Sequence, residues 1–154
     1  MTHHTGPIIG ERDGLRAIEC RACGYAHLEK MPTAAELQTF YESDFWQHTK
    51  AGWRERYEAE QDYHAEKFGD WLSLIEQRTQ GRTLLDVGCG YGFFLREAKK
   101  RGWGIAGIDP SREAIEYAKN LCGAGYAFFP GSWEESLTNM RFDCISALWL
   151  IEHL

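Results

Sequence analysis

The stretch Leu84–Ser111, LLDVGCGYGFFLREAKKRGWGIAGIDPS, decides the fold of this chain. It is entered through an apolar run, Thr83–Val87, that is typical of a buried strand and leads into three alternating glycines. A segment of helical character, Phe93–Arg101, follows, and a second apolar run, Gly104–Ile108, ends on Asp109. This order of strand, glycine loop, helix and strand predicts one βαβ unit that holds a nucleoside.

The spacing of the glycines narrows the kind of nucleoside. A dinucleotide loop follows the pattern GxGxxG, which brings backbone amides and a helix N-terminus to a pyrophosphate. Here the third glycine comes one residue early, at Gly92, and the bulky Phe93 stands in its place. The pattern therefore favours a nucleoside without a diphosphate. For such a ligand Asp109 is the expected acceptor of the ribose hydroxyls. Asp86 is expected to brace the loop amides or to reach an ammonium group through water.

Three short motifs occur in a fixed order along the chain. Leu85–Gly92 reads LDVGCGYG, Gly107–Ser111 reads GIDPS, and Phe142-Asp143 is followed by LIEHL at Leu150–Leu154. Together they resemble the class I S-adenosylmethionine-dependent methyltransferases, in which an FD opens the fourth strand. A glycine turn in another α/β domain is the alternative. The resemblance implies an α/β fold with a Rossmann-like parallel sheet, and methyl transfer from S-adenosylmethionine to a small molecule at O, N or C.

The resemblance also implies which residues bind the cofactor. Tyr126–Pro130 reads as the third strand, after which the family usually carries an acidic residue that meets the adenine. This chain has Ser132 and Trp133 there, for a hydrogen bond and for contact with the adenine face. The backbone near Leu148 would face the methionine moiety. The expected cofactor-binding residues are Asp86, Gly88, Cys89, Gly90, Gly92, Asp109, Pro110, Ser132, Trp133 and Leu148.

His153 is the expected proton acceptor near the site of transfer. Methyl transfer from a sulfonium is an in-line displacement, so positioning does most of the catalysis and a base matters only when the acceptor must lose a proton. The alternative is that Glu152 and His153 end the strand structurally. One related group of methyltransferases binds a metal through an acidic residue three positions before the Glu-His pair. That position is Trp149 here, so we expect no such metal ligand in this chain.

Composition bounds the class of protein. A chain of 154 residues normally forms one domain with a real core. The net charge of −6 argues against a general phosphate-binding surface, so we expect no nucleic-acid partner. No apolar run has membrane-spanning length and no signal-peptide pattern is present, which predicts a cytoplasmic protein without membrane contact. Five cysteines without a regular framework fit a reducing compartment.

The segment 1–32 holds a CxxCG motif at Cys20, Cys23 and Gly24. This spacing lets two thiolates reach one zinc ion from a tight turn, and His27 with one of His3 or His4 could complete a Cys2His2 set. Some small-molecule methyltransferases that this chain resembles carry a zinc-ribbon-like segment ending in CxxCG. The first cysteine pair of that ribbon is missing here, so a zinc site and a metal-free remnant both stay open. A redox pair is less favoured, since no thioredoxin-like βαβ unit surrounds it.

Residues 33–80 read as a helical lead-in to the sheet. Thr33–Glu36 is a capping box that starts a helix to about Tyr41, followed by an aromatic-rich connection over residues 43–52. Apolar side chains at helical spacing predict an amphipathic helix over Trp53–Arg78, broken at Gly69. Its aromatic residues are expected either to pack in the core or to contact the sulfonium through cation–π interactions. The aromatic candidates are Trp53, Tyr57 and Tyr63.

The sheet of the resembled family has seven strands, and this sequence accounts for four of them, within residues 81–154. The Rossmann-like domain is therefore expected to be incomplete, and a homodimer is one way to cover the open edge beside Cys144–Leu150. Three alternatives stay open for the function. They are a cofactor-binding fragment without catalysis, a zinc-ribbon interaction module on a degenerate fold, and a nicotinamide oxidoreductase, against which Phe93 argues.

Overall fold

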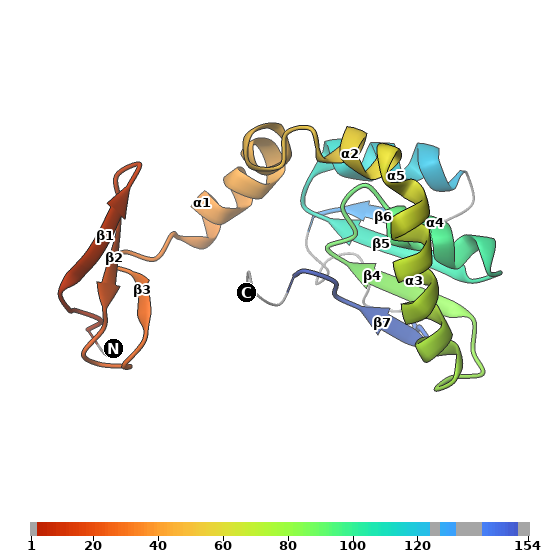
Figure 1. Cartoon of the computed structure of the whole chain (residues 1–154), viewed down its shortest axis with the longest axis horizontal. Coiled ribbons are helices and arrows are strands. Elements are labelled where there is room, and N and C mark those ends of the chain that lie inside the picture. The colour runs from red at the N-terminus through yellow and green to blue at the C-terminus, as the bar shows by residue number, and fades with distance from the viewer. Residues whose placement is uncertain (1–2, 124–126, 132–139, 151–154) are drawn as a thin grey trace. The chain divides into compact units, whose positions relative to one another are not determined.

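A computed structural model describes residues 3–123, 127–131 and 140–150 of the chain. The chain divides into two compact units, Met1–Leu37 and Gln38–Leu154, each with its own sheet (Figure 1). The predicted cysteine-bearing segment, residues 1–32, lies within the first unit. No helix in the described ranges is both long enough and apolar enough to cross a membrane.

The first unit is a three-stranded antiparallel sheet of β1 (Ile8–Arg12), β2 (Leu15–Glu19) and β3 (Ala26–Leu28), in that order. Asp13 and Gly14 join β1 to β2 with φ angles of 53° and 78°. Positive φ at both positions of a two-residue loop is what an Asp-Gly hairpin turn requires. The hydrophobic core of this unit is very small.

The helical lead-in differs from the prediction in two places. The capping box is confirmed, because Thr33 N donates to Glu36 Oε2 at 2.7 Å and Glu36 N donates to Thr33 Oγ1 at 3.2 Å. The predicted connection over residues 43–52 is wrong for residues 43–49 and holds only for the turn at residues 50–52. After α1 (Ala34–Thr39) the chain continues as a π-helical segment, Phe40–Thr49.

The predicted break at Gly69 is also wrong. The helices α2 (Trp53–Ala59) and α3 (Gln61–Glu76) meet at Glu60, whose φ of −100° and ψ of 22° interrupt the helical path. Gly69 lies inside α3, where the Ser73 hydroxyl donates to its carbonyl oxygen at 2.8 Å. A single glycine costs a helix only about 1 kcal/mol, and packing of α3 on its neighbours offsets that cost.

The second unit contains a four-stranded parallel sheet, which confirms the Rossmann-like α/β class. Its strands are β4 (Thr83–Val87), β5 (Gly104–Asp109), β6 (Ala127–Pro130) and β7 (Cys144–Ser146), in the order β6-β5-β4-β7. The first strand and the glycine loop after it lie where the sequence predicts them. The helices α4 (Phe93–Lys100) and α5 (Arg112–Cys122) connect β4 to β5 and β5 to β6.

One hydrophobic core joins α3, α4 and α5 to this sheet. Leu72, Leu95 and Ile115 come from the three helices and have no exposed surface. Gly107 of β5 lets α4 approach closely, since a Cβ there would lie 2.7 Å from Cys89 Sγ and 2.8 Å from Leu95 Cδ1. This close packing of helix on strand brings Cys89 of the glycine loop and Leu95 of α4 against β5.

The ends of two elements test the sequence prediction further. Ser111 caps α5 as expected, its hydroxyl accepting from Ala114 N at 3.2 Å. The predicted strand Phe142–Leu150 is wrong in extent, because β7 covers only Cys144–Ser146. Asp143 precedes this strand, and its carboxylate accepts hydrogen bonds from Thr83 N and Thr83 Oγ1. A turn that contains Trp149, with a φ of 53°, follows the strand. This turn brings residues 148–150 over the ends of the strands.

Candidate functional site

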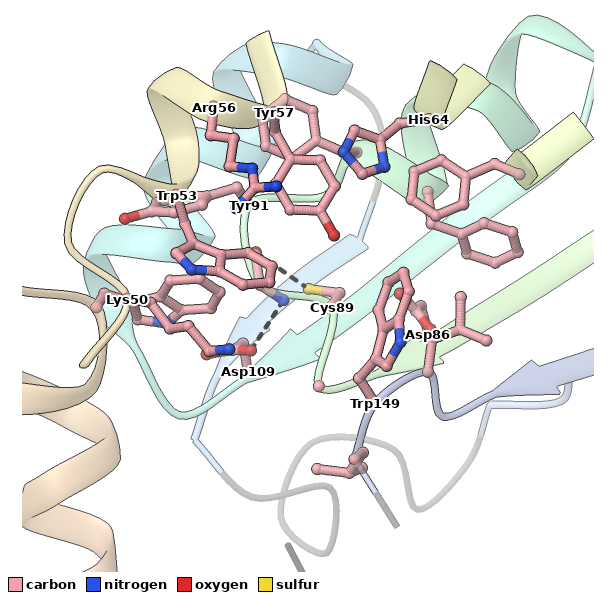
Figure 2. A pocket seen from close by; sticks show the side chains of 18 of the residues that line it. Lys50, Trp53, Arg56, Tyr57, His64, Asp86, Cys89, Tyr91, Asp109 and Trp149 are labelled. Carbon is pink, nitrogen blue, oxygen red and sulfur yellow. Dashed lines mark hydrogen bonds between the residues drawn. The ribbon is translucent and has the colours of Figure 1, made fainter. Parts of the chain in front are cut away.

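The carboxyl ends of β4 and β5, the glycine loop and the turn after β7 form the floor of a cavity of about 650 Å³ (Figure 2). Helical residues between 41 and 68 form its walls. Every lining residue belongs to the second unit. Eleven of the lining residues are aromatic: Tyr41, Phe45, Trp46, Trp53, Tyr57, Tyr63, Phe68, Tyr91, Phe93, Phe94 and Trp149.

The glycine loop presents bare backbone to this cavity. Gly88 and Gly90 adopt φ angles of 74° and 50°, in the left-handed region that favours glycine. The amides of Gly88 and Cys89 both donate to Ile108 O, at 2.8 and 3.0 Å, so the loop is tied to β5. A Cβ on Gly90 would lie 2.9 Å from the Trp46 ring. Glycine at position 90 therefore allows the Trp46 ring to lie directly against the loop.

Asp109, at the end of β5, is the carboxylate beside this loop. Its Oδ2 accepts from Gly90 N at 2.9 Å (Figure 2), and its Oδ1 accepts from Ser111 N at 2.9 Å. Burial raises the pKa of Asp109, against the hydrogen bonds from Ser111, Gly90 and the Trp46 side chain. The sequence assigned the bracing of a loop amide to Asp86. In the structure Asp109 braces Gly90, because the loop folds back over β5.

Asp86 has a different environment one strand away. Its Oδ1 accepts from Ser146 Oγ at 2.7 Å, across the register that pairs the two residues on β4 and β7. Burial raises the pKa of Asp86 to about 7, against the Ser146 hydrogen bond and with a further rise from the charge of Asp109. Within the described residues no cation pairs with this carboxylate. A ligand cation at this end of the cavity would stabilise its ionised form.

The aromatic wall is built by stacking. Tyr57 packs between His64 and Phe93, with ring centroids 4.0 and 4.9 Å apart. Phe93, which replaces the third glycine of a dinucleotide loop, thus has a structural partner in the helical lead-in. Trp46 lies 4.5 Å from Tyr91 between ring centroids, directly over the loop. Trp53, Tyr57 and Tyr63, the predicted candidates for a sulfonium contact, all line the cavity.

Two lysines add positive charge to the wall. Lys50 Nζ lies 3.9 Å from the centroid of the Trp53 ring. Lys67 Nζ lies 5.0 Å from the Trp149 ring. Neither lysine forms an ion pair with another described residue, whereas Arg56 pairs with Glu60 at 3.1 Å. Both ammonium groups thus lie against aromatic rings that line the cavity.

His64 contributes the one buried side-chain nitrogen or oxygen, in the described part of the chain, that lacks a hydrogen-bond partner. That atom is Nδ1, and Nε2 lies 3.6 Å from Glu60 Oε2. Burial lowers the pKa of His64, partly offset by Glu60, while Lys67 and Arg56 lower it further. The ring is accordingly neutral near pH 7. A buried polar atom without a partner is unusual in a folded protein and is consistent with a functional role for this side chain.

The structure brings most of the predicted cofactor residues together. Gly92 is not among the lining residues; a Cβ there would lie 2.9 Å from Ala118 Cβ, so it serves the packing of α4 on α5. The predicted contacts at Ser132, Trp133 and His153 lie outside the described residues. The predicted residues that line the cavity are Asp86, Gly88, Cys89, Gly90, Asp109, Pro110 and Leu148.

Trp46 and His64 were not predicted from sequence as site residues. Trp46 falls in the segment read as a connection, and His64 was assigned to the apolar face of a helix. The density of aromatic residues over 40–57 is the one signal in the sequence that could have found this wall. The predicted metal ligands Cys20 and Cys23 lie in the first unit, close to His4 and His27.

Sheet order, glycine loop and strand-end carboxylate define a Rossmann-like nucleoside-binding domain. A profile of the methyltransferase domain family matches residues 53–154. The chain belongs to this family, and the resemblance to class I methyltransferases is confirmed.

Curated relatives carry the same likeness. The chain is 35% identical over 89 residues to the ubiquinone biosynthesis O-methyltransferase of Coxiella burnetii, a match that covers 54% of this chain and 38% of the relative. It is 29% identical over 80 residues to the mitochondrial enzyme of that name from Schizosaccharomyces pombe, covering 48% and 29%. The chain thus spans well under half the length of these relatives.

A solved structure shows the same fold. The magnesium protoporphyrin IX methyltransferase of Synechocystis PCC 6803 with bound SAM superposes with a TM-score of 0.59 at 15% identity. The match covers 81% of this chain and 65% of the other.

Proposed function

We propose that this chain takes part in methyl transfer from S-adenosylmethionine to a small-molecule acceptor, at O, N or C. The observation that carries the proposal is the buried Asp109 beside a bare glycine loop, in a chain of the methyltransferase family. When bound, the cofactor supplies an electrophilic methyl group on a sulfonium. The chain supplies the binding groups and the orientation.

The residues of the cavity fit this cofactor. A carboxylate offers about four lone-pair positions, and at Asp109 the amides of Gly90 and Ser111 and the Trp46 side chain take three of them. Exchange of the Trp46 bond would leave two positions for the two ribose hydroxyls. Asp86, buried without a cationic partner among the described residues, suits the ammonium group, and the aromatic wall suits an adenine ring and a sulfonium.

Some methyl acceptors must lose a proton during the reaction and therefore need a base. Two histidines are candidates for this base. His153 follows from the family resemblance. His64 follows from the structure, because burial lowers its pKa and its Nδ1 has no hydrogen-bond partner in the part of the chain that the structure describes. That atom is covered by neighbouring side chains, so Tyr57 would have to shift before His64 accepted a proton. Positioning remains the main contribution to the rate in either case.

The acceptor we propose is flat and largely apolar, with an anionic substituent. The aromatic lining favours a flat body, and Lys50 and Lys67 favour the anionic group. A nucleic acid is not the expected acceptor, since the net charge is −6.

We also propose that two copies of the chain form a homodimer. Ile145 on the edge strand β7 is 65% exposed, and strand pairing between two copies would cover it. The mass of the protein in solution, measured by light scattering with Ile145→Lys as the comparison, tests this. A monomeric wild-type chain at high concentration would refute it.

The second candidate function is nucleoside binding without transfer. This candidate is favoured because the described groups of the cavity have clearer roles in binding a cofactor than in binding a methyl acceptor. Calorimetric titration with S-adenosylhomocysteine, with NADH as the control ligand, is the first test. Saturable one-to-one binding of S-adenosylhomocysteine alone supports both candidates, and absence of binding in a folded sample contradicts both.

Transfer of labelled methyl groups to a panel of phenols, carboxylated aromatics and amines then separates the two candidates. Transfer to any of them establishes catalysis, and binding without transfer favours the second candidate. His64→Gln and His153→Gln, compared over a range of pH, show which histidine accepts the proton. The base is the histidine whose replacement removes the acid limb of the pH–rate profile.

A further inference from the structure

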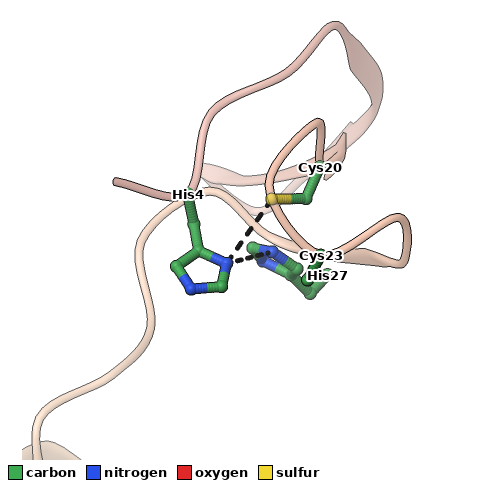
Figure 3. Close-up of side chains that lie close together, drawn as sticks. All are labelled: His4, Cys20, Cys23 and His27. Carbon is green, nitrogen blue, oxygen red and sulfur yellow. Dashed lines mark hydrogen bonds between the residues drawn. The ribbon is translucent and has the colours of Figure 1, made fainter. Parts of the chain in front are cut away.

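The first unit gathers four metal-binding side chains at one point (Figure 3). His4, Cys20, Cys23 and His27 each offer one ligand atom, and these atoms all lie within 4.8 Å of one another. The cluster is separate from the cavity described above, which is lined only by residues of the second unit.

The backbone of the unit is built so that His4 reaches the cysteines. Residues 5–7 lie along the end of β2, where Glu19 N donates to Pro7 O and Arg21 N donates to Thr5 O, at 3.0 and 2.9 Å. A Cβ on Gly6 would overlap the carbonyl oxygen of Glu19, so only glycine allows this close approach. His4 is thereby held beside Cys20.

The two cysteines lie on a tight turn between β2 and β3. Gly24 N donates to Cys20 O at 2.9 Å, and Gly24 has a φ of 76°. Cys20 N donates to Tyr25 O at 3.0 Å, which closes the turn. His27 follows on β3, paired in register with Ile18 of β2. Both cysteines are free thiols.

Two of the distances between ligand atoms are close to those around a tetrahedral ion, and all lie within 4.8 Å. With zinc bonds of about 2.3 Å to sulfur and about 2.0–2.1 Å to nitrogen, tetrahedral ligand atoms lie roughly 3.3–3.8 Å apart. His4 Nδ1 lies 3.2 Å from His27 Nε2 and 3.4 Å from Cys20 Sγ. Without a metal ion, only a few shared protons could hold four such atoms this close together.

The tautomer of His27 also points to a ligand. Its Nδ1 lies 2.7 Å from the carbonyl oxygen of Leu28, and a carbonyl only accepts, so Nδ1 carries the proton. The lone pair of the neutral ring is then on Nε2, which faces His4 and the cysteines. Orientation of a ligating imidazole by a backbone carbonyl is a usual feature of metal sites.

The size of the unit adds an independent reason. Among its described residues only Ile18 and Cys20 are buried apolar side chains, while Ile8, Ile9 and Leu15 are each more than half exposed. Folded units below about 40 residues usually need a disulfide, a metal or a partner to be stable. This unit has no disulfide.

We propose that His4, Cys20, Cys23 and His27 form a closed Cys2His2 site for one zinc ion, which stabilises the first unit. Two thiolates and two imidazoles in a tetrahedral arrangement select zinc over harder cations. All four positions are taken by protein atoms, so the role is structural.

Metal analysis of the full chain tests the assignment. The protein, kept under reducing conditions, is saturated with Zn²⁺, freed of excess ion and measured for zinc per chain. Co²⁺ is then titrated in place of Zn²⁺ and followed by its visible absorption. We expect one zinc per chain, and for Co²⁺ tetrahedral d–d bands with thiolate charge transfer.

His4→Ala and His3→Ala form a matched pair, because His3 precedes His4 and lies outside the cluster. We expect His4→Ala to raise the dissociation constant for Zn²⁺ at least tenfold, and His3→Ala to leave it unchanged. Cys23→Ser provides a second variant with the same expected loss.

Three results would overturn the proposal: zinc well below one per wild-type chain after saturation, an octahedral Co²⁺ spectrum, or equal affinity of the two histidine variants. The dissociation constant of S-adenosylhomocysteine, measured on the same samples, shows whether the second unit stays folded in each variant. Loss of zinc with an unchanged second unit supports the site.

Discussion

The two units of this chain are stabilised in different ways. The second unit buries side chains such as Phe68, Leu95 and Ile115 between helices and a parallel sheet. The first buries only Ile18 and Cys20 among its described residues, and gathers cysteine and histidine side chains. The comparison supports the proposal that the short sheet depends on its cluster of ligands, whereas the second unit has a hydrophobic core of its own.

Removal of metal should affect one unit and leave the other unchanged. A chelator is expected to unfold the first unit, because zinc binding contributes about 10 kcal/mol or more in small zinc domains. Trypsin should then cut at Arg12, Arg16 and Arg21. The second unit should keep its resistance, and cleavage that is insensitive to the chelator would contradict this division.

A core substitution should show the opposite pattern. Leu95→Ala removes a fully buried side chain of α4 and is expected to cost about 2–5 kcal/mol of unfolding free energy in the second unit. Leu74→Ala, at a position 56% exposed on α3, should cost less than about 0.5 kcal/mol. Denaturant titration measures both. Zinc affinity should be the same in the two variants, and a change in Leu95→Ala alone would show that the units are coupled.

The pH dependence of stability should identify Asp86. Its pKa is raised to about 7, so the native state keeps a proton that the unfolded chain loses near pH 4. The unfolding free energy should therefore fall as pH rises from about 4 to about 7, by at most about 1.4 kcal/mol per pH unit. Asp86→Asn should remove much of this slope and stabilise the second unit at pH 7.

The same variant should weaken binding of the cofactor. Asp86→Asn removes the charge proposed to face the ammonium group, so a gain in stability should accompany a loss in affinity for S-adenosylhomocysteine. An unchanged slope between pH 4 and 7 would contradict the assigned pKa, and unchanged affinity would contradict the assigned role.

Asp109→Asn should reduce affinity for S-adenosylhomocysteine by about 2 kcal/mol, roughly 30-fold, because the ribose hydroxyls lose a charged acceptor. Asp70→Asn, an exposed acidic position on α3, is the matched control and should bind as the wild type does. Calorimetry gives both values. Equal affinities would remove Asp109 from the proposed site.

The smallest effect is expected at Trp46. Trp46→Phe keeps an aromatic ring over Gly90 but removes the hydrogen bond to Asp109. If the ribose takes that position on binding, the variant should bind S-adenosylhomocysteine as tightly as the wild type or up to about 1 kcal/mol more tightly. A substantially weaker variant would show that the Trp46 bond persists in the complex.

The sequence by itself determined the parts whose causes are local. The apolar run Thr83–Val87, the cap at Ser111 and the capping box at Thr33 each act within a few residues, and each lies where it was predicted. The spacing of the glycines and the presence of Phe93 are also local features, and they distinguish this loop from a dinucleotide-binding loop.

Tertiary structure decided which of several suitable residues is used. Asp109 rather than Asp86 braces Gly90, since the loop folds over β5. Trp46 and His64 reach the cavity through ring contacts with Tyr91 and Tyr57, and His4 rather than His3 joins the cysteines because residues 5–7 lie along β2. Helix boundaries at Glu60 and the short β7 likewise depend on packing between segments far apart in the chain, which no local pattern of residues records.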